Sequence, residues 1–290
     1  MNPLPANAMR VTHNRRFAVA EAVVMTSSPA DLVDIGANLT HESFRPDFDA
    51  VLARAREAGV AQILVTGASA GGSRAAQALA QDHSGFLFAT AGVHPHHAHE
   101  YDDATDALLR ELAATPEVKA VGETGLDYFR NYSPHAAQVE AFERQLSIAV
   151  DCGKPLFLHQ RDAHADFIAC LDRVRDRISR AVVHCFTGER NELVDYLDRD
   201  CFIGITGWIC DERRGLHLRE LARLIPADRL MIETDAPYLL PRDLRPKPSH
   251  RRNEPMYLGH VCAAVAAARG EDVAVTARTT TANARRFFAL

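Results

Sequence analysis

The chain has 290 residues, of which 47% are hydrophobic and 24% are charged, and its formal net charge at pH 7 is −5. This composition is typical of a soluble globular protein and excludes intrinsically disordered and collagen-like chains. The negative net charge also excludes a protein that coats nucleic acid with a broad basic surface, so any contact with nucleic acid must be local.

Residues 1–30 precede the first strand-like run and have no sustained period. They contain three arginines before a short apolar stretch that Glu21 interrupts. A membrane span needs about 20 consecutive apolar residues, so we expect no membrane anchor and no membrane partner. Because no small-residue cleavage site follows, the segment does not read as a signal peptide. We interpret 1–30 as a flexible extension, in which Met25 is an alternative start, and 31–290 as one domain.

The six cysteines form no C-x-x-C pair. Three of them lie in apolar runs, a pattern typical of reduced thiols in a cytosolic protein. We therefore expect a cytoplasmic protein, and we expect it to be monomeric.

From residue 31 onward, short apolar runs alternate with longer segments of helical period. The apolar runs predict strands at 32–35, 62–65, 86–92, 118–122, 155–158, 181–183, 202–205 and 230–232. The periodic segments predict helices at 49–58, 70–82, 103–114, 136–152, 165–176, 191–197, 216–224, 255–270 and 272–288. Eight consecutive βα units favour an α/β fold with a closed (β/α)₈ TIM barrel over a doubly wound open sheet.

Histidines and carboxylates follow several of these strands, at the end of the barrel where active sites lie. Glu123 follows the fourth strand, His159 the fifth, His184 the sixth and Asp235 the eighth. Each alone has a structural explanation, such as a buried histidine or a turn cap. Together they supply two imidazoles and two carboxylates, the ligands of Zn²⁺, Mn²⁺ or a related divalent ion. We interpret them as a hydrolytic metal site.

Two residues near this set carry weaker signals. His94 follows the third strand and is a further candidate for the site. Cys185 adjoins His184 and suggests a thiol nucleophile, but neighbouring strand residues point to opposite faces, which favours a role in the core.

Basic and aromatic residues gather in the segments that follow the later strands. The segment 241–254 has five basic residues and two acidic ones, and it follows the last strand, where barrels often bind phosphate. A solvated proline-rich loop is the structural alternative. Arginines for phosphates and aromatic faces for unstacked bases are what a single-strand nucleic-acid site requires. Our candidates for that role are Arg161, Arg213, Arg214, Arg251, Arg252, Trp208 and Tyr128.

Several short motifs resemble those of the TatD-type metal-dependent deoxyribonucleases, within the amidohydrolase-like barrels. They are AGVHPH at 91–96, GETGLD at 122–127, HQRDAH at 159–164, HCFTG at 184–188, IETDAPYL at 232–239 and RNEP at 252–255. The stretches 203–214 and 232–255 resemble the bacterial TatD branch. This resemblance implies a TIM barrel, and for that branch a 3′ to 5′ exonuclease that prefers single-stranded DNA and RNA, uses Mg²⁺ and serves DNA repair.

The resemblance also implies that Glu123, His159 and His184 bind the metal, with Asp235 as an acidic site residue. The chain departs from the wider family at the first strand, where His-x-His is replaced by Gly36-Ala37-Asn38. This departure puts a second strongly held metal in doubt and leaves Asn38 and Asp34 as candidate oxygen ligands. Because two imidazoles favour softer ions than Mg²⁺, Mn²⁺ and Zn²⁺ remain alternatives.

We expect the metal to polarise the scissile phosphate and to activate a water. Asp235 would orient or deprotonate that water, and Glu123 would be the other catalytic carboxylate. One alternative on the same scaffold is a deacylase of aminoacyl-tRNA, since fold does not fix the substrate. Another is a non-catalytic nucleic-acid-binding protein.

Overall fold

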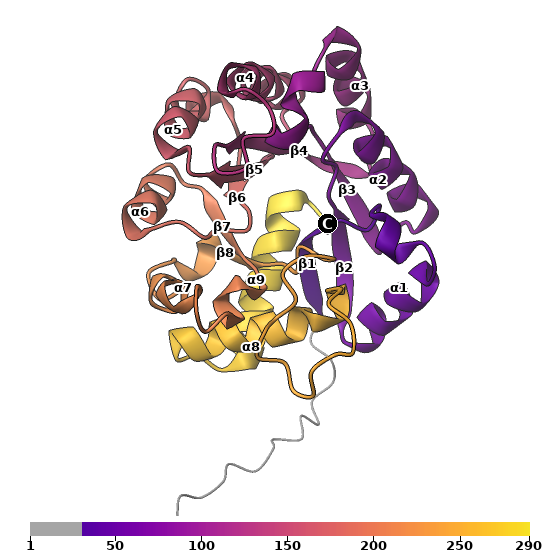
Figure 1. The fold of residues 1–290 in the computed structure, drawn as a ribbon, viewed down its shortest axis with the longest axis vertical. Helices are drawn as coiled ribbons and strands as arrows, with labels where there is room; N and C mark the ends of the chain where they lie inside the picture. The colour runs from indigo at the N-terminus through magenta and orange to yellow at the C-terminus, as the bar shows by residue number, and fades with distance from the viewer. Residues whose placement is uncertain (1–30) are drawn as a thin grey trace, which may run out of the picture.

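The computed structural model describes residues 31–290, so the extension expected at 1–30 lies outside the described residues. Eight parallel strands form one sheet whose spatial order follows the chain from the first strand to the eighth. They are β1 (Leu32–Ala37), β2 (Val60–Val65), β3 (Leu87–Ala91), β4 (Val118–Asp127), β5 (Leu156–Arg161), β6 (Ala181–Val183), β7 (Phe202–Ile205) and β8 (Leu230–Ile232). Helices surround the sheet (Figure 1), which confirms the predicted (β/α)₈ barrel.

The first and last strands close the barrel through a few contacts between their ends. Ala37 and Ala236 form a parallel bridge. The buried Asp34 carboxylate accepts hydrogen bonds from the backbone N–H and the hydroxyl of Thr234, at 2.9 and 2.5 Å. Burial raises the pKa of Asp34 to about 7, although the bonds from Thr234 lower it. Both oxygens of Asp34 thus serve the junction between β1 and β8.

The connecting segments are mostly α-helices with short 3₁₀ turns. The α-helices are α1 (Phe48–Glu57), α2 (Ala70–Asp82), α3 (Asp103–Ala113), α4 (His135–Cys152), α5 (His164–Asp172), α6 (Arg190–Asp198), α7 (Leu216–Leu221), α8 (Leu258–Arg269) and α9 (Val273–Phe288). The 3₁₀ turns used below are η2 (Pro95–Glu100), η4 (Gly207–Cys210) and η6 (Pro255–Tyr257). Within residues 31–290, no helix is long and apolar enough to cross a membrane.

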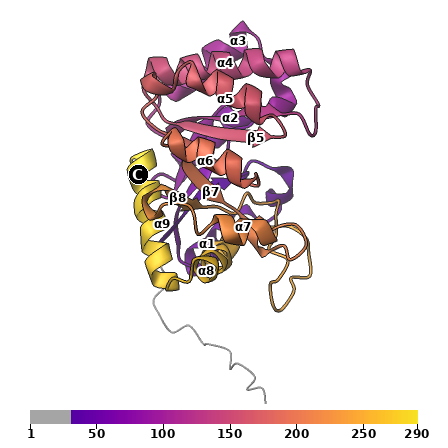
Figure 2. The ribbon, with the colours of Figure 1, turned by 90° about the vertical axis from the view of Figure 1, so that its left-hand side faces the viewer.

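The last helix plugs one end of the barrel. Phe287 and Phe288 of α9 pack with inward-facing strand residues such as Val33, Phe157 and Phe202. Figure 2 shows α9 on one side of the molecule, with the loop between β8 and α8 projecting from the opposite side. The carboxyl ends of the strands are therefore left for the polar residues described below.

The observed strands differ most from the predicted ones at the carboxyl ends of β4 and β5, where polar residues continue the pairing between the strands. The fourth strand was expected to stop at 122 and the fifth at 158, but β4 reaches Asp127 and β5 reaches Arg161. Their pairing includes a register shift between Val121 and Thr124, and it continues through Gly125 with His159. Glu123 and His159 consequently lie on paired strands instead of on loops.

Candidate metal centre and adjoining cavity

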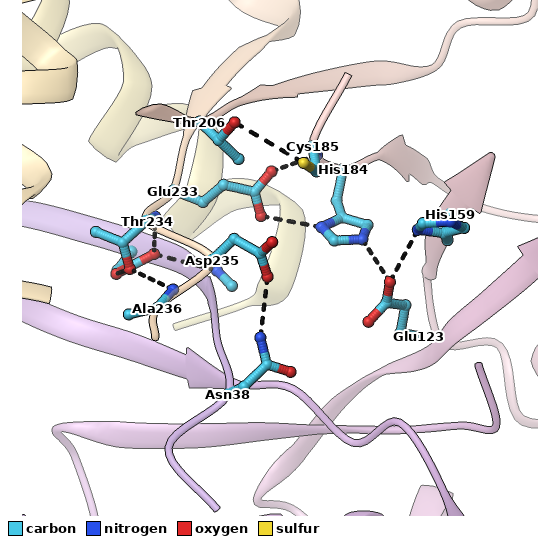
Figure 3. A network of polar contacts seen from close by, with 12 residues as sticks. Asn38, Glu123, His159, His184, Cys185, Thr206, Glu233, Thr234, Asp235 and Ala236 are labelled. Carbon is cyan, nitrogen blue, oxygen red and sulfur yellow. Dashed lines mark hydrogen bonds and ion pairs between the residues drawn. The ribbon is translucent and has the colours of Figure 1, made fainter. Parts of the chain in front are cut away.

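One carboxylate oxygen lies at the centre of three imidazole rings. Oε1 of Glu123 is 2.8 Å from Nε2 of His184, 3.1 Å from Nδ1 of His159 and 3.3 Å from Nε2 of His94. Figure 3 shows Glu123 between His184 and His159. His94, Glu123 and His159 each offer a ligand atom, and these atoms lie within 4.8 Å of one another. The candidate His94 is thus brought into the same group as Glu123, His159 and His184.

The local backbone around Glu123 depends on a glycine. Gly122 has φ +139°, and a Cβ at that position would collide with the carbonyl oxygen of Phe157 on β5. Only glycine adopts this conformation without strain and permits so close an approach. The close packing of β4 on β5 sets Glu123 beside His159. His184 directly follows β6, and His94 directly precedes η2, three residues after the end of β3.

The pKa values of His184 and His159 indicate that the carboxylates around them stabilise positive charge. Burial lowers the pKa of His184, but the charges of Glu123 and Glu233 raise it by more, to well above its ordinary value. Burial also lowers the pKa of His159, but the neighbouring carboxylates of Asp127 and Glu123 raise it by more. For His94, burial prevails and its pKa falls well below the usual range. Carboxylates and imidazoles are the donors of a divalent cation, and a bound cation would take the place of the protons on these rings.

A second carboxylate lies on the outer side of His159. Oδ2 of Asp127 is 2.9 Å from Nε2 of His96 and 3.5 Å from Nε2 of His159. Nε2 of His159 is buried without a hydrogen-bond partner in the described chain. Asp127 and His96 lie in the motifs quoted above, but they were not among the predicted site residues.

A third carboxylate, Glu233, lies against His184 and was also missed. It is fully buried, its Oε2 is 3.3 Å from Nδ1 of His184, and its Oε1 accepts the backbone N–H of Cys185 at 2.5 Å. A Cβ on Gly36 would lie 2.5 Å from Oε2, and one on Gly204 would lie 2.6 Å from Oε1. Glycine at 36, where the wider family resemblance places a histidine, therefore leaves room for the Glu233 side chain.

Asp235 and Asn38 lie side by side on the face of the site opposite His159 (Figure 3). Asn38 donates from Nδ2 to Oδ1 of Asp235 at 2.9 Å. Burial raises the pKa of Asp235 to about 7, with help from Glu123 and Glu233 and against His184 and Asn38. Asp34, by contrast, uses its oxygens on Thr234 and on the N–H of Gly36.

Cys185 follows β6 with φ +46°, outside the regular strand, so simple alternation does not decide where its side chain points. Its Sγ lies 3.8 Å from the hydroxyl of Thr206. Burial raises the pKa of the thiol well above its ordinary value, and a protonated thiol is a poor nucleophile.

A cavity of about 290 Å³ is lined by segments that follow His159 and His184 in the chain, although neither histidine is part of its wall. Its wall begins with Gln160 and Arg161, which directly follow His159, and continues with Thr187 and Gly188, which follow His184. Trp208, Arg214 and His217 complete the other side, together with Asp162, Glu189, Glu192 and Leu218. Three of the predicted nucleic-acid contacts, Arg161, Arg214 and Trp208, therefore line one cavity.

The guanidinium of Arg214 lies 4.4 Å from the ring centroid of Trp208. Arg161 lies 4.7 Å from the ring of Phe129, an exposed aromatic. Tyr128 stacks on His135 and donates to Asp166 at 2.8 Å, and it is absent from the cavity wall. Arg213 is exposed on the turn after η4.

The two arginines after the loop 241–250 differ in their surroundings. Arg251 is exposed, whereas Arg252 makes two bonds of 2.8 Å to Asp47 and one of 2.7 Å to Glu254. Arg54 contacts the same two carboxylates, at 3.0 and 2.8 Å. Arg252 thus joins the segment before η6 to the start of α1.

Known proteins place the chain in a family. A family model described as "TatD related DNase" matches residues 33–289. A protein of Erwinia tasmaniensis named "3'-5' ssDNA/RNA exonuclease TatD" is 53% identical over 259 residues, which cover 89% of this chain and 100% of the relative. A protein of the same name from Enterobacter lignolyticus is 53% identical over 257 residues, covering 89% of this chain and 98% of the relative.

Solved structures of similar proteins agree with this family assignment. A TatD homologue from Escherichia coli K12 has 27% identity and a TM-score of 0.81, covering 89% of this chain and 98% of that one. A hydrolase of the TatD family from Entamoeba histolytica has 25% identity and a TM-score of 0.78, covering 90% and 99%. The predicted class, a metal-dependent nuclease that hydrolyses phosphodiesters, is confirmed, and neither the aminoacyl-tRNA deacylase nor the non-catalytic alternative is needed. The chain belongs to the TatD-related DNase family.

Proposed function

We propose that this protein is a metal-dependent exonuclease that removes nucleotides from the 3′ end of single-stranded DNA and RNA. The main observation behind this proposal is the group of three imidazoles around the Glu123 carboxylate. A cavity lined by two arginines and an indole, built from segments that follow His159 and His184, supports a nucleic-acid substrate. The names of the relatives at 53% identity support the polarity and the substrate.

Glu123, His159 and His184 hold the divalent cation, with Asp235 as a further ligand and His94 completing the donors around Glu123. When bound, the cation polarises the phosphodiester and makes water a better nucleophile at neutral pH. The working ion is Mg²⁺, for which the carboxylate oxygens are suited, and Mn²⁺ and Zn²⁺ are its competitors at the imidazoles.

Asp235 receives the proton of the attacking water. Its carboxylate is oriented by Asn38 at 2.9 Å and lies near the imidazoles, and its pKa of about 7 suits a group that takes up a proton near neutrality. Asp34 shares in the site through Thr234 and Gly36, whose positions it fixes beside Asp235.

The cavity receives the end of the strand. Arg161 and Arg214 contact phosphates and Trp208 stacks on a base, since every base presents a face to an aromatic ring. Arg213, Arg251, Arg252 and Tyr128 extend this surface along the rim. For Arg252, phosphate binding competes with its bonds to Asp47 and Glu254.

We also propose that the protein is a cytoplasmic monomer that serves DNA repair. The test of the activity itself is digestion of a linear single strand with and without chelation. Mg²⁺ or Mn²⁺ should support release of mononucleotides, and excess EDTA should abolish it. Undiminished cleavage in EDTA would show that the proposed centre does not perform the reaction.

A further inference from the structure

A second group of metal-ligand side chains lies away from Glu123. Cys210, Asp243 and His260 each offer one ligand atom, and these atoms lie within 4.8 Å of one another. We call these three residues the Cys210 cluster. Its closest pair is Nε2 of His260 and Oδ1 of Asp243, at 2.7 Å.

The cluster joins three segments that are distant in the chain. Cys210 is the last residue of η4, Asp243 lies in the loop between β8 and α8, and His260 lies in the first turn of α8. Helix α8 packs directly on η4. Thiolate, carboxylate and imidazole groups are all zinc ligands in proteins, and here one of each converges from separate segments.

The spacing also fits. A tetrahedral zinc with bonds of roughly 2.0–2.3 Å keeps its ligand atoms about 3.3–3.8 Å apart. The His260–Asp243 pair is 2.7 Å apart and all three ligand atoms lie within 4.8 Å of one another, which is compatible with that spacing. Small rotations of Asp243 and His260, which are about 41% and 34% exposed, are enough to reach it.

Burial distinguishes the inner and outer sides of the cluster. Cys210 is fully buried, so its sulfur is not accessible as a nucleophile. The half-exposed Asp243 and His260 leave the outer side open for entry of an ion and for a water as fourth ligand. The set of one sulfur, one nitrogen and one oxygen favours Zn²⁺ over Mg²⁺ and Ca²⁺, which take oxygen ligands.

We propose that Cys210, Asp243 and His260 form a zinc site that is separate from the catalytic centre and clamps the loop between β8 and α8 onto η4. The clamp bears on the nucleic-acid cavity because Trp208, two residues before Cys210, lines it. Its ion ties the wall of the cavity to the loop that carries Arg251.

The experiment uses the metal-free full-length protein titrated with Co²⁺, which replaces zinc and gives a near-ultraviolet charge-transfer band when a thiolate binds it. The wild-type chain should give this band, and Zn²⁺ should bleach it. Cys210→Ser should abolish the band. His260→Ala should lower the affinity for Co²⁺ at least about tenfold, as loss of a group that supports a metal does.

The controls separate this site from the catalytic centre. Cys185→Ser tests the thiol beside His184, and Cys262→Ser tests another buried thiol; both should keep the band. His159→Ala should keep it too, although its nuclease activity is lost. If Cys210→Ser does not fold by circular dichroism, His260→Ala, at a partly exposed position, gives the answer alone. No band in the wild type, or a band that is unchanged in His260→Ala, would overturn the proposal and leave the cluster as a hydrogen-bonded brace.

Discussion

Glu233 and Glu123 lie against opposite nitrogens of the same imidazole. Oε2 of Glu233 is 3.3 Å from Nδ1 of His184, and Oε1 of Glu123 is 2.8 Å from its Nε2. An ionised carboxylate can only accept a hydrogen bond. Glu233 therefore keeps a proton on Nδ1 of His184 and directs Nε2 of the same ring toward Glu123.

Glu233→Gln should therefore weaken metal binding about 10–100-fold, the usual effect of losing a carboxylate that orients a ligand histidine. At saturating metal, kcat should recover toward the wild-type value. Titration of activity with Mn²⁺ measures both quantities. Glu254→Gln changes another buried carboxylate, one that pairs with Arg54 and Arg252 instead of a histidine, and it should leave the metal dependence unchanged.

Removing a group from the centre itself should have a larger effect. His159→Ala or Glu123→Ala should lower kcat by several orders of magnitude while the far-ultraviolet circular dichroism stays that of a folded barrel. His164→Ala is the matched control, since this histidine bonds to Asp195 and Tyr196 instead of Glu123. A variant of either site residue with near-normal kcat would remove that residue from the proposed mechanism.

The positions of these groups could be predicted from sequence only in part. The rule that polar residues after apolar runs meet at one rim of a barrel identified Glu123, His159, His184 and Asp235. Glu233 also follows its strand directly, but the sequence does not say that Gly36 and Gly204, distant in the chain, leave space for its side chain. His96 and Asp127 join the site through the extension of β4 beyond 122, which no apolar pattern marks.

Arg252 provides a test of stability. Its hydrogen bonds are the largest cause holding the pKa of Asp47 below its ordinary value. A carboxyl group whose pKa is lowered by folding stabilises the folded state at pH values above about 4, which is its pKa in the unfolded chain. This stability is lost as the pH falls below that value. Arg252→Ala should lower the free energy of unfolding by about 1–3 kcal/mol at pH 7, because it removes one partner of the buried Glu254 carboxylate. The loss is no larger because Glu254 keeps its salt bridge to Arg54. The difference from wild type should shrink below about pH 4.

Urea unfolding at pH 7 and in acid measures this difference. The exposed neighbour Arg251 is the matched comparison. Arg251→Ala should leave stability within about 0.5 kcal/mol of wild type. Because we propose that Arg251 contacts phosphate, Arg251→Ala should also raise KM and reduce the dependence of KM on salt. Equal stability of Arg252→Ala and wild type at pH 7 would show that the network with Asp47 contributes nothing.

Trp208 gives a direct view of the cavity, because it is the one tryptophan among the 290 residues. In an inactive His159→Ala background, addition of a short single-stranded oligonucleotide should quench its fluorescence through stacking. Trp208→Ala in the active enzyme should raise KM about 5–150-fold, corresponding to the roughly 1–3 kcal/mol of a base stacked on an aromatic ring. Fluorescence unchanged at saturating oligonucleotide would place the strand elsewhere.

The central claim is that the centre around Glu123 cleaves a single strand progressively from its 3′ end. The most direct measurement is digestion of a 5′-labelled linear single strand, beside its duplex and a closed single-stranded circle, with Mg²⁺. Our account predicts a ladder that shortens stepwise while the label stays on the longest remaining fragments, slower degradation of the duplex, and an intact circle. Immediate release of a labelled mononucleotide, or cutting of the circle at the rate of the linear strand, would contradict it.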